Sequence, residues 1–230
     1  YEVKLKKSRV KDINDAKGKM VIEITKDCKG YFQKQRMGIK LNNPNGSQFF
    51  SDYNYYTWES IDSEKLSFSN KNYLNGKLRE NYTGNAIRRA EDIFISFEDN
   101  ASEEIKLNKE VLFPTQYFKS LIESSIKGSK ILEKKIYDGS GPEGVYNTVA
   151  VISKPKITGE DKVYSDKLNN IRLWWINMAY FSDISNDPIP DYQAEFNLYS
   201  NGVITNLNLD YGRFVIETKL VKLEYIKSTC

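Results

Sequence analysis

Apolar and polar residues alternate along most of the chain, a pattern typical of β-strands that bury one face. The predicted strands lie at residues 3–5, 20–24, 31–41, 49–58, 66–68, 73–79, 93–97, 131–137, 148–152, 171–181, 192–199, 203–209 and 213–226. Because short polar connections separate these runs, the pattern predicts an antiparallel meander of about thirteen strands.

Turn-forming residues separate several of these strands. We expect turns at Asn43-Pro44-Asn45-Gly46, at Asn75-Gly76 and at Asp15-Ala16-Lys17-Gly18, where Gly, Pro, Asn and Asp favour tight reversals. No repeat or long polar linker divides the sequence, which therefore predicts a single domain over residues 1–230. A meander of this length is expected to curl, since open twisted sheets rarely exceed ~10 strands.

One segment has the period of a helix. Phe118, Leu121, Ile122 and Ile126 recur at spacings of three and four, which places them on one stripe of an amphipathic helix over residues 115–127. We expect Thr115 as its N-cap and Gly128 just beyond its C-terminus. The predicted fold is thus all-β, with one amphipathic helix packed against the sheet.

The composition agrees with a folded domain. Hydrophobic residues make up 40% of the 230 residues and aromatic residues 13%, enough for a substantial core. No apolar run approaches the ~18 to 20 residues of a membrane-crossing helix. The sequence starts at Tyr1-Glu2 without the features of a signal peptide. Either the protein has none, or the sequence begins after its removal.

The positive charge is concentrated near the start. Residues 1–40 carry twelve Lys/Arg and five Asp/Glu, a balance of +7, so a net charge of +3 leaves −4 for the remainder. Such a segment could contact anionic lipid or nucleic acid. Its lysines alternate with apolar residues, however, as on the solvent face of a sheet. We favour that interpretation and expect no nucleic-acid partner.

No set of residues predicts catalysis. The chain has no histidine, which excludes the usual Ser-His-Asp mechanism and histidine metal sites. Asp183, Asp187 and Asp191 lack the spacing and the glycine of a calcium loop. The glycine-rich stretch 138–144 lies between two predicted strands, so we expect a loop and no phosphate site. The sequence therefore predicts a non-enzymatic protein without catalytic residues, metal or cofactor.

The aromatic pair Trp174-Trp175 is the best candidate for binding. Adjacent strand residues face opposite sides, so both can enter a core only if both faces are covered. Either one packs in the core and the helix covers the other, or one lines a groove or meets a partner. The candidate groove or partner surface comprises Trp174, Trp175, Tyr117 and Phe118.

Cys28 and Cys230 are the only cysteines. Their spacing suggests no metal or redox motif, which leaves a long-range disulfide or two free thiols. A disulfide would indicate an oxidising compartment.

Several short motifs together resemble the EipB-like family of cell-envelope integrity proteins, found in the periplasm of alphaproteobacteria. The matching segments are 18–23, Cys28-x-Gly30-Tyr31, 57–60, Phe113-Pro114-Thr115, 137–140, 179–181, 190–192, 201–203, 209–214 and Cys230. Each motif is weak alone, but their order covers the chain from residue 18 to its end. Tyr117 departs from the histidine expected after Phe-Pro-Thr.

The resemblance implies more than the periodicity does. It implies an exported protein folded as an open, barrel-like β-spiral, similar to periplasmic lipoprotein-carrier half-barrels, with Cys28 and Cys230 bridged. It also implies a role in envelope integrity and stress resistance without catalytic residues, and a tetratricopeptide-type periplasmic partner. Our leading hypothesis is a binding module for a periplasmic protein, with peripheral contact to the envelope. The alternative is a carrier that holds lipid or lipoprotein in the concavity of the curled sheet.

Overall fold

The computed structural model describes residues 1–98, 104–157, 165–184 and 187–227. The first half contains β1 (Glu2–Ser8), β2 (Asp15–Lys26), β3 (Gly30–Asn42), β4 (Gln48–Ser60), β5 (Lys65–Leu74), β6 (Lys77–Arg89), β7 (Asp92–Phe97), β8 (Glu104–Asn108) and helix α1 (Pro114–Ile126). The second half contains β9 (Ile131–Tyr137), β10 (Val145–Ile152), β11 (Lys156–Ile157), α2 (Ser165–Leu168), β12 (Arg172–Ser182), β13 (Tyr192–Tyr199), β14 (Ile204–Asp210) and β15 (Phe214–Lys219).

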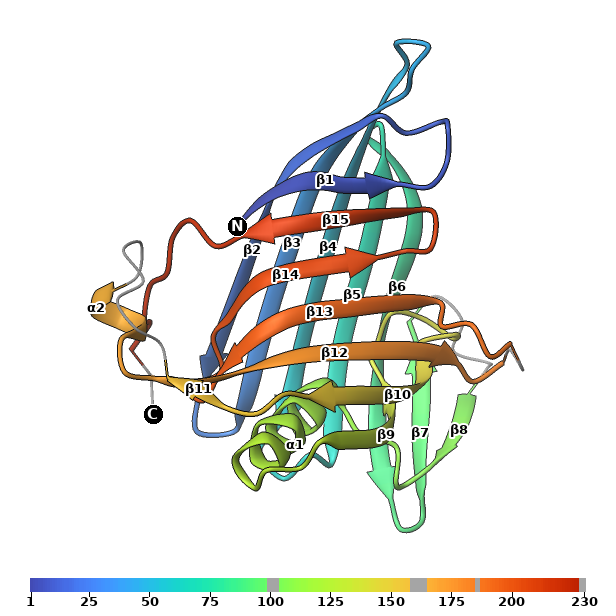
Figure 1. Ribbon diagram of the computed structural model, residues 1–230. Helices are drawn as coiled ribbons and strands as arrows, with labels where there is room; N and C mark the ends of the chain where they lie inside the picture. The colour runs from blue at the N-terminus through green and yellow to red at the C-terminus, as the bar shows by residue number, and fades with distance from the viewer. Residues whose placement is uncertain (99–103, 158–164, 185–186, 228–230) are drawn as a thin grey trace.

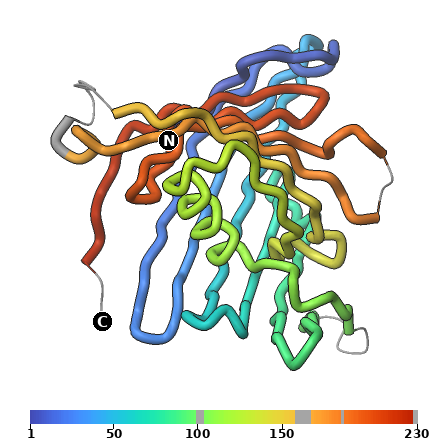
Figure 2. Tube along the Cα trace, turned by 60° about the horizontal axis from the view of Figure 1, so that its bottom comes forward, coloured from blue at the N-terminus to red at the C-terminus, as the bar shows by residue number. Residues whose placement is uncertain are grey.

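The fifteen strands of the described residues form one sheet, in the order β8-β7-β6-β5-β4-β3-β2-β1-β15-β14-β13-β12-β10-β9, with β11 paired to β12. The path remains open between β8 and β9. The sheet curls so that β12–β15 cross in front of the long strands β2–β6, and α1 lies in the curl at one end (Figure 1). Seen from that end, α1 sits between the two walls (Figure 2). This arrangement confirms the predicted all-β, open, barrel-like meander.

The turn predictions were partly correct. Asn75 and Gly76 have φ of 51° and 75°, as a two-residue hairpin turn requires, and they connect β5 to β6. The turn predicted at Asp15–Gly18 is wrong, because these residues lie inside β2. A Cβ at Gly18 would lie 2.2 Å from the carbonyl oxygen of Gly38. This glycine therefore permits a close approach of two backbones and does not mark a reversal.

Helix α1 begins one residue earlier than predicted. Its N-cap is Phe113, which has an extended backbone (φ −87°, ψ 163°) and precedes Pro114 at the first helical position. The proline ring disfavours a helical conformation for the residue before it, so the helix begins at Pro114. Thr115 is therefore not the N-cap. At the other end, Gly128 has φ +81° and ends the helix as predicted.

The buried stripe of α1 is also rotated from the predicted one. Tyr117, Leu121 and Ser125 are buried, whereas the predicted core residue Ile126 is 53% exposed. Hydroxyl groups are tolerated on this stripe because they have partners. The Ser125 hydroxyl donates to the carbonyl oxygen of Leu121 at 2.7 Å.

A buried carboxylate connects α1 to the wall behind it. Glu59 on β4 is 1% exposed, and its oxygens accept the backbone N–H groups of Thr115 (2.7 Å) and Gln116 (2.9 Å). The Ser63 hydroxyl donates to the same carboxylate at 3.0 Å. The first N–H groups of a helix have no partner within the helix, and they favour a negative charge. Burial nevertheless raises the pKa of Glu59, and the hydrogen bonds offset only part of that effect.

We predict that Glu59→Ala lowers the free energy of unfolding by about 2 to 4 kcal/mol, because two buried helix donors lose their acceptor. Urea denaturation would measure the difference. Glu123→Ala, at an exposed carboxylate of the same helix, is the matched control and should stay within about 0.5 kcal/mol of the wild type. Equal unfolding midpoints for Glu59→Ala and the wild type would contradict the assigned role.

Candidate functional site

The two adjacent tryptophans face opposite sides of β12. Trp174 is 1% exposed and belongs to the core that includes Tyr117 and Leu121 of α1. Trp175 is 38% exposed on the outer face. The helix thus packs with Trp174, and Trp175 is left for another role.

Tyr117 and Phe118 do not share a surface with Trp175, because both pack against the interior core. Tyr117 is 5% exposed, and its hydroxyl donates to the sulfur of Met178 at 2.8 Å. Burial raises its pKa to about 12. Phe118 is partly buried against the same core. Of the four predicted surface residues, only Trp175 is therefore placed to meet a partner.

A groove lined mostly by polar residue types lies next to Trp175 on the outer face of the sheet. The indole N–H of Trp175 donates to the Glu195 carboxylate at 2.9 Å, and Glu195 is one of the groove residues. The groove has a volume of about 400 Å³. Its lining comes from β1 and β12–β15 and consists of Lys6, Lys7, Asn177, Gln193, Glu195, Asn208, Asp210 and Val215.

Two irregularities in strand pairing shape this groove. In β1 the register shifts between Leu5 and Lys7, so Lys6 is an extra residue opposite β15. In β13 the register with β14 shifts between Glu195 and Asn197, where Asn206 of β14 has φ +52°. Bulges bend a strand and redirect its side chains. These two lie beside the groove and account for a hollow on an otherwise regular sheet face.

The groove carries charges of both signs. Lys6 and Lys7 line one part of it, and Glu195 and Asp210 another. The guanidinium of Arg9 holds Asp210 through two hydrogen bonds of 2.6 and 2.7 Å. These bonds lower the pKa of Asp210 and fix its carboxylate in the charged form. Such a lining suits a ligand with both donors and acceptors.

The interior contains a second group of polar side chains. On the β10–β14 wall, Tyr180 stacks on Tyr192 with ring centroids 4.1 Å apart, and Tyr146 packs edge-on against both. Tyr53 and Tyr55 stack on β4 of the long-stranded wall. Burial raises the pKa of each of these hydroxyls. Hydroxyl groups, and not hydrocarbon alone, therefore line the middle of the interior.

The loop after β9 enters this interior. The hydroxyl of Tyr55 donates to the carbonyl oxygen of Asp138, and the side-chain amide of Asn70 donates to the carbonyl oxygen of Ser140 at 2.9 Å. The Asp138 carboxylate accepts the Ser140 N–H at 2.8 Å, yet burial raises its pKa to about 6. The glycine-rich stretch is thus a structural loop, as the sequence predicted, and Asp138 is a partly buried residue that sequence reasoning did not single out.

Asp183, Asp187 and Asp191 follow β12. Asp183 forms an ion pair with Lys135 at 2.7 Å. Within residues 1–98, 104–157, 165–184 and 187–227, no group of three His, Cys, Asp or Glu residues could hold a metal ion. Nor does this part of the chain contain a helix long and apolar enough to cross a membrane.

Comparison with known proteins identifies the family. The model of the EipB-like family matches residues 1–227. The chain belongs to the EipB-like family. The chain is similar to the cell envelope integrity protein EipB of Brucella abortus (strain 2308), with 28% identity over 229 residues. The alignment covers 97% of this EipB-like chain and 81% of the relative.

A solved structure confirms the fold of the EipB-like chain. It is the crystal structure of a beta-barrel-like protein of domain of unknown function DUF1849 from Brucella abortus, which matches with a TM-score of 0.90 at 26% identity. The match covers 99% of this chain and 96% of that one.

We predict that Asp138 makes the stability of this EipB-like chain depend on pH. Its folded-state pKa of about 6 lies above the ordinary value of about 3.9. Its contribution is therefore complete below about pH 4 and is lost as the pH rises through 6. Asp138→Asn removes the titration, so its free energy of unfolding relative to the wild type should rise between pH 4 and 7, by up to about 3 kcal/mol.

Urea denaturation at several pH values would measure this change. Asp191→Asn, at an exposed carboxylate whose charge acts on Tyr146, is the matched control for the loss of one negative charge. If the difference between Asp138→Asn and the wild type were the same at every pH, the assignment would be wrong.

Proposed function

We propose that this EipB-like protein supports the integrity of the cell envelope without catalysis, by binding a periplasmic protein partner in the groove beside Trp175. The relationship to a cell envelope integrity protein supports the envelope role. The observation that supports this binding site is the exposed Trp175. Its indole N–H donates a hydrogen bond to Glu195, which lines a groove of about 400 Å³.

The chemistry of the groove favours a protein over a lipid. Asn177, Gln193 and Asn208 present amide donors and acceptors, which match the N–H and C=O groups of a polypeptide. Trp175 beside them is a residue type enriched among the dominant contacts of protein interfaces. A tetratricopeptide-type protein, implied by the resemblance, is the partner class that we propose.

A lipid or lipoprotein carrier would need room for an acyl chain inside the curled sheet. Leu121 of α1 and Trp174 of β12 belong to one packed core that fills the interior at the helix end. Tyrosine hydroxyls line the middle of the interior. These features make the outer groove the better candidate.

Site-specific photo-crosslinking in intact cells would test the groove. A photoreactive residue at Gln193 should capture one discrete partner, and a charge reversal at Glu195 should reduce the capture. The matched control is the same photoreactive residue at Leu78, which is 50% exposed on β6 of the other wall. Equal capture from Gln193 and Leu78, or none from either, would refute the proposed surface.

We propose the periplasm as the compartment, with Cys28 bridged to Cys230. Cys28 lies in the turn between β2 and β3, where the Asp27 carboxylate accepts the N–H groups of Lys29 (2.8 Å) and Gly30 (2.7 Å). Cys230 lies outside the described residues, so the pairing stays a prediction. The last described segment, 220–227, lies on the same side of the molecule as this turn in Figures 1 and 2.

A thiol count tests the bridge directly. Protein purified from an oxidising compartment without reductant should show no free thiol after denaturation, and mass spectrometry should detect a peptide joining Cys28 to Cys230. Reduction should lower the free energy of unfolding by up to roughly 5 kcal/mol, because the bridge closes a very long loop. Two free thiols would argue against both the bridge and the compartment.

A further inference from the structure

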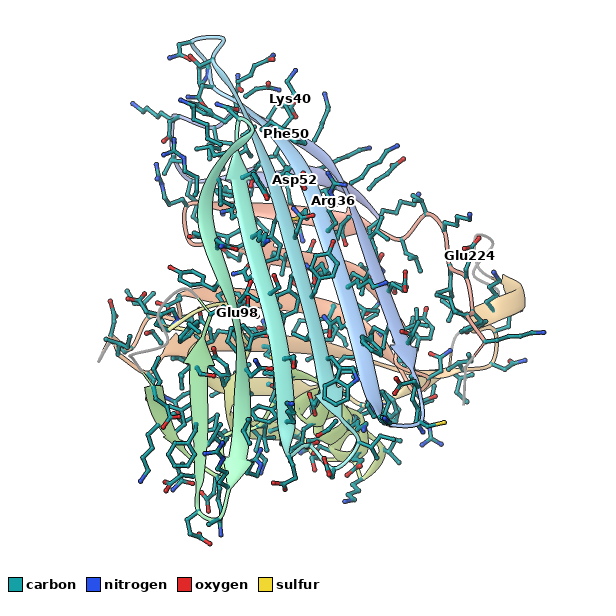
Figure 3. All side chains as sticks on the ribbon, turned by 180° about the vertical axis from the view of Figure 1, so that it is seen from behind. Arg36, Lys40, Phe50, Asp52, Glu98 and Glu224 are labelled. Atoms are coloured by element: carbon teal, nitrogen blue, oxygen red, sulfur yellow. The ribbon has the colours of Figure 1, made fainter. Side chains whose placement is uncertain are left out.

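A separate surface lies on the outer face of β2–β5, behind the groove. The strand registers place Lys17 opposite Lys40 and Lys40 opposite Phe50. They also place Val21 opposite Arg36, Arg36 opposite Asn54, and Asn54 opposite Lys71. Seen from behind, these strands form the near wall, and Arg36, Lys40, Phe50 and Asp52 lie along it (Figure 3). We call this surface the basic face.

Three carboxylates on the basic face each form an ion pair with a basic residue of the same face. Asp15 pairs with Lys17 at 3.0 Å, Glu23 with Lys34 at 3.6 Å, and Asp52 with Arg36 at 2.7 Å.

Among the cations for which the described part of the chain provides no ion pair are Lys19, Lys40 and Lys71. Lys40 also lies directly across from Lys17, and like charges in that position repel each other. The surplus charge of the face is therefore positive, and it matches an anionic partner.

Apolar groups are exposed among these lysines. Val21 is 65% exposed, Phe50 47% and Tyr56 44%. Phe50 packs next to Gly38, where an added Cβ would lie 3.3 Å from its ring. Basic residues mixed with aromatic and aliphatic ones are typical of surfaces that lie on a membrane. The groove beside Trp175 does not lie on this face, so the face suits an extended partner better than a small molecule.

We propose that the basic face is a docking surface for an anionic phospholipid bilayer. Lys19, Lys40 and Lys71 supply the charge, while Val21, Phe50 and Tyr56 contact the headgroup region. The groove beside Trp175 lies on the other wall and stays free when the basic face is docked. This inference does not depend on the proposed partner site.

Vesicle co-sedimentation of the full chain tests the proposal. Binding should be measurable on phosphatidylcholine vesicles that contain phosphatidylglycerol, weak on phosphatidylcholine alone, and reduced by added salt. The variant Lys19→Gln/Lys40→Gln/Lys71→Gln should bind the anionic vesicles on the order of 10- to 100-fold more weakly, since each basic residue contributes to adsorption.

The matched control is Lys127→Gln/Lys130→Gln/Lys134→Gln, which removes the same charge from exposed positions at α1 and β9. It should keep most of the wild-type binding, and both variants should melt at the wild-type temperature. A wild type without preference for anionic vesicles would overturn the proposal, as would equal losses in the two variants. Crosslinking from Gln193 should be unchanged in the Lys19/Lys40/Lys71 variant, which separates this test from that of the partner site.

Discussion

The contact between the Glu59 carboxylate and the first turn of α1 is the interaction on which the interior of this molecule depends. A sheet of fifteen strands curls too widely for its two walls to meet along their whole length, and α1 occupies the space at one end. A helix inside a sheet must find partners for its first N–H groups away from water. Glu59 provides them from one wall, and Leu121 and Trp174 pack the helix against the other.

Local chemistry made much of the fold predictable. Alternation located most strands because one face of the sheet is buried, and Asn75-Gly76 marked a hairpin because few other pairs adopt positive φ twice. The failures arose where a residue served a distant part of the chain. Gly18 suggested a turn, but its role is set by Gly38 on the next strand. The buried stripe of α1 could not be predicted because both walls of the curl contact the helix.

The candidate sites were less accessible to sequence reasoning. Strand alternation correctly separated Trp174 from Trp175, but the groove arises from two breaks in strand register that no local pattern records. Asp138 was part of a recognised motif, and only the packed structure shows that its loop enters the interior. The surplus of lysines in residues 1–40 was visible in the sequence, but which lysines lack an ion pair emerges only after the ion pairs of neighbouring strands are assigned.

The position of β1 has a consequence for how the chain is made. This strand pairs with β2 on one side and with β15 on the other, so its second edge has no partner until β15 has been synthesised. The hairpins from β2 to β7 can form as they emerge, whereas this pairing must span the length of the chain and is expected to form slowly. Until then β1 presents an open edge that another chain can join. The period before β15 has been synthesised is therefore when this protein most needs protection from its own copies.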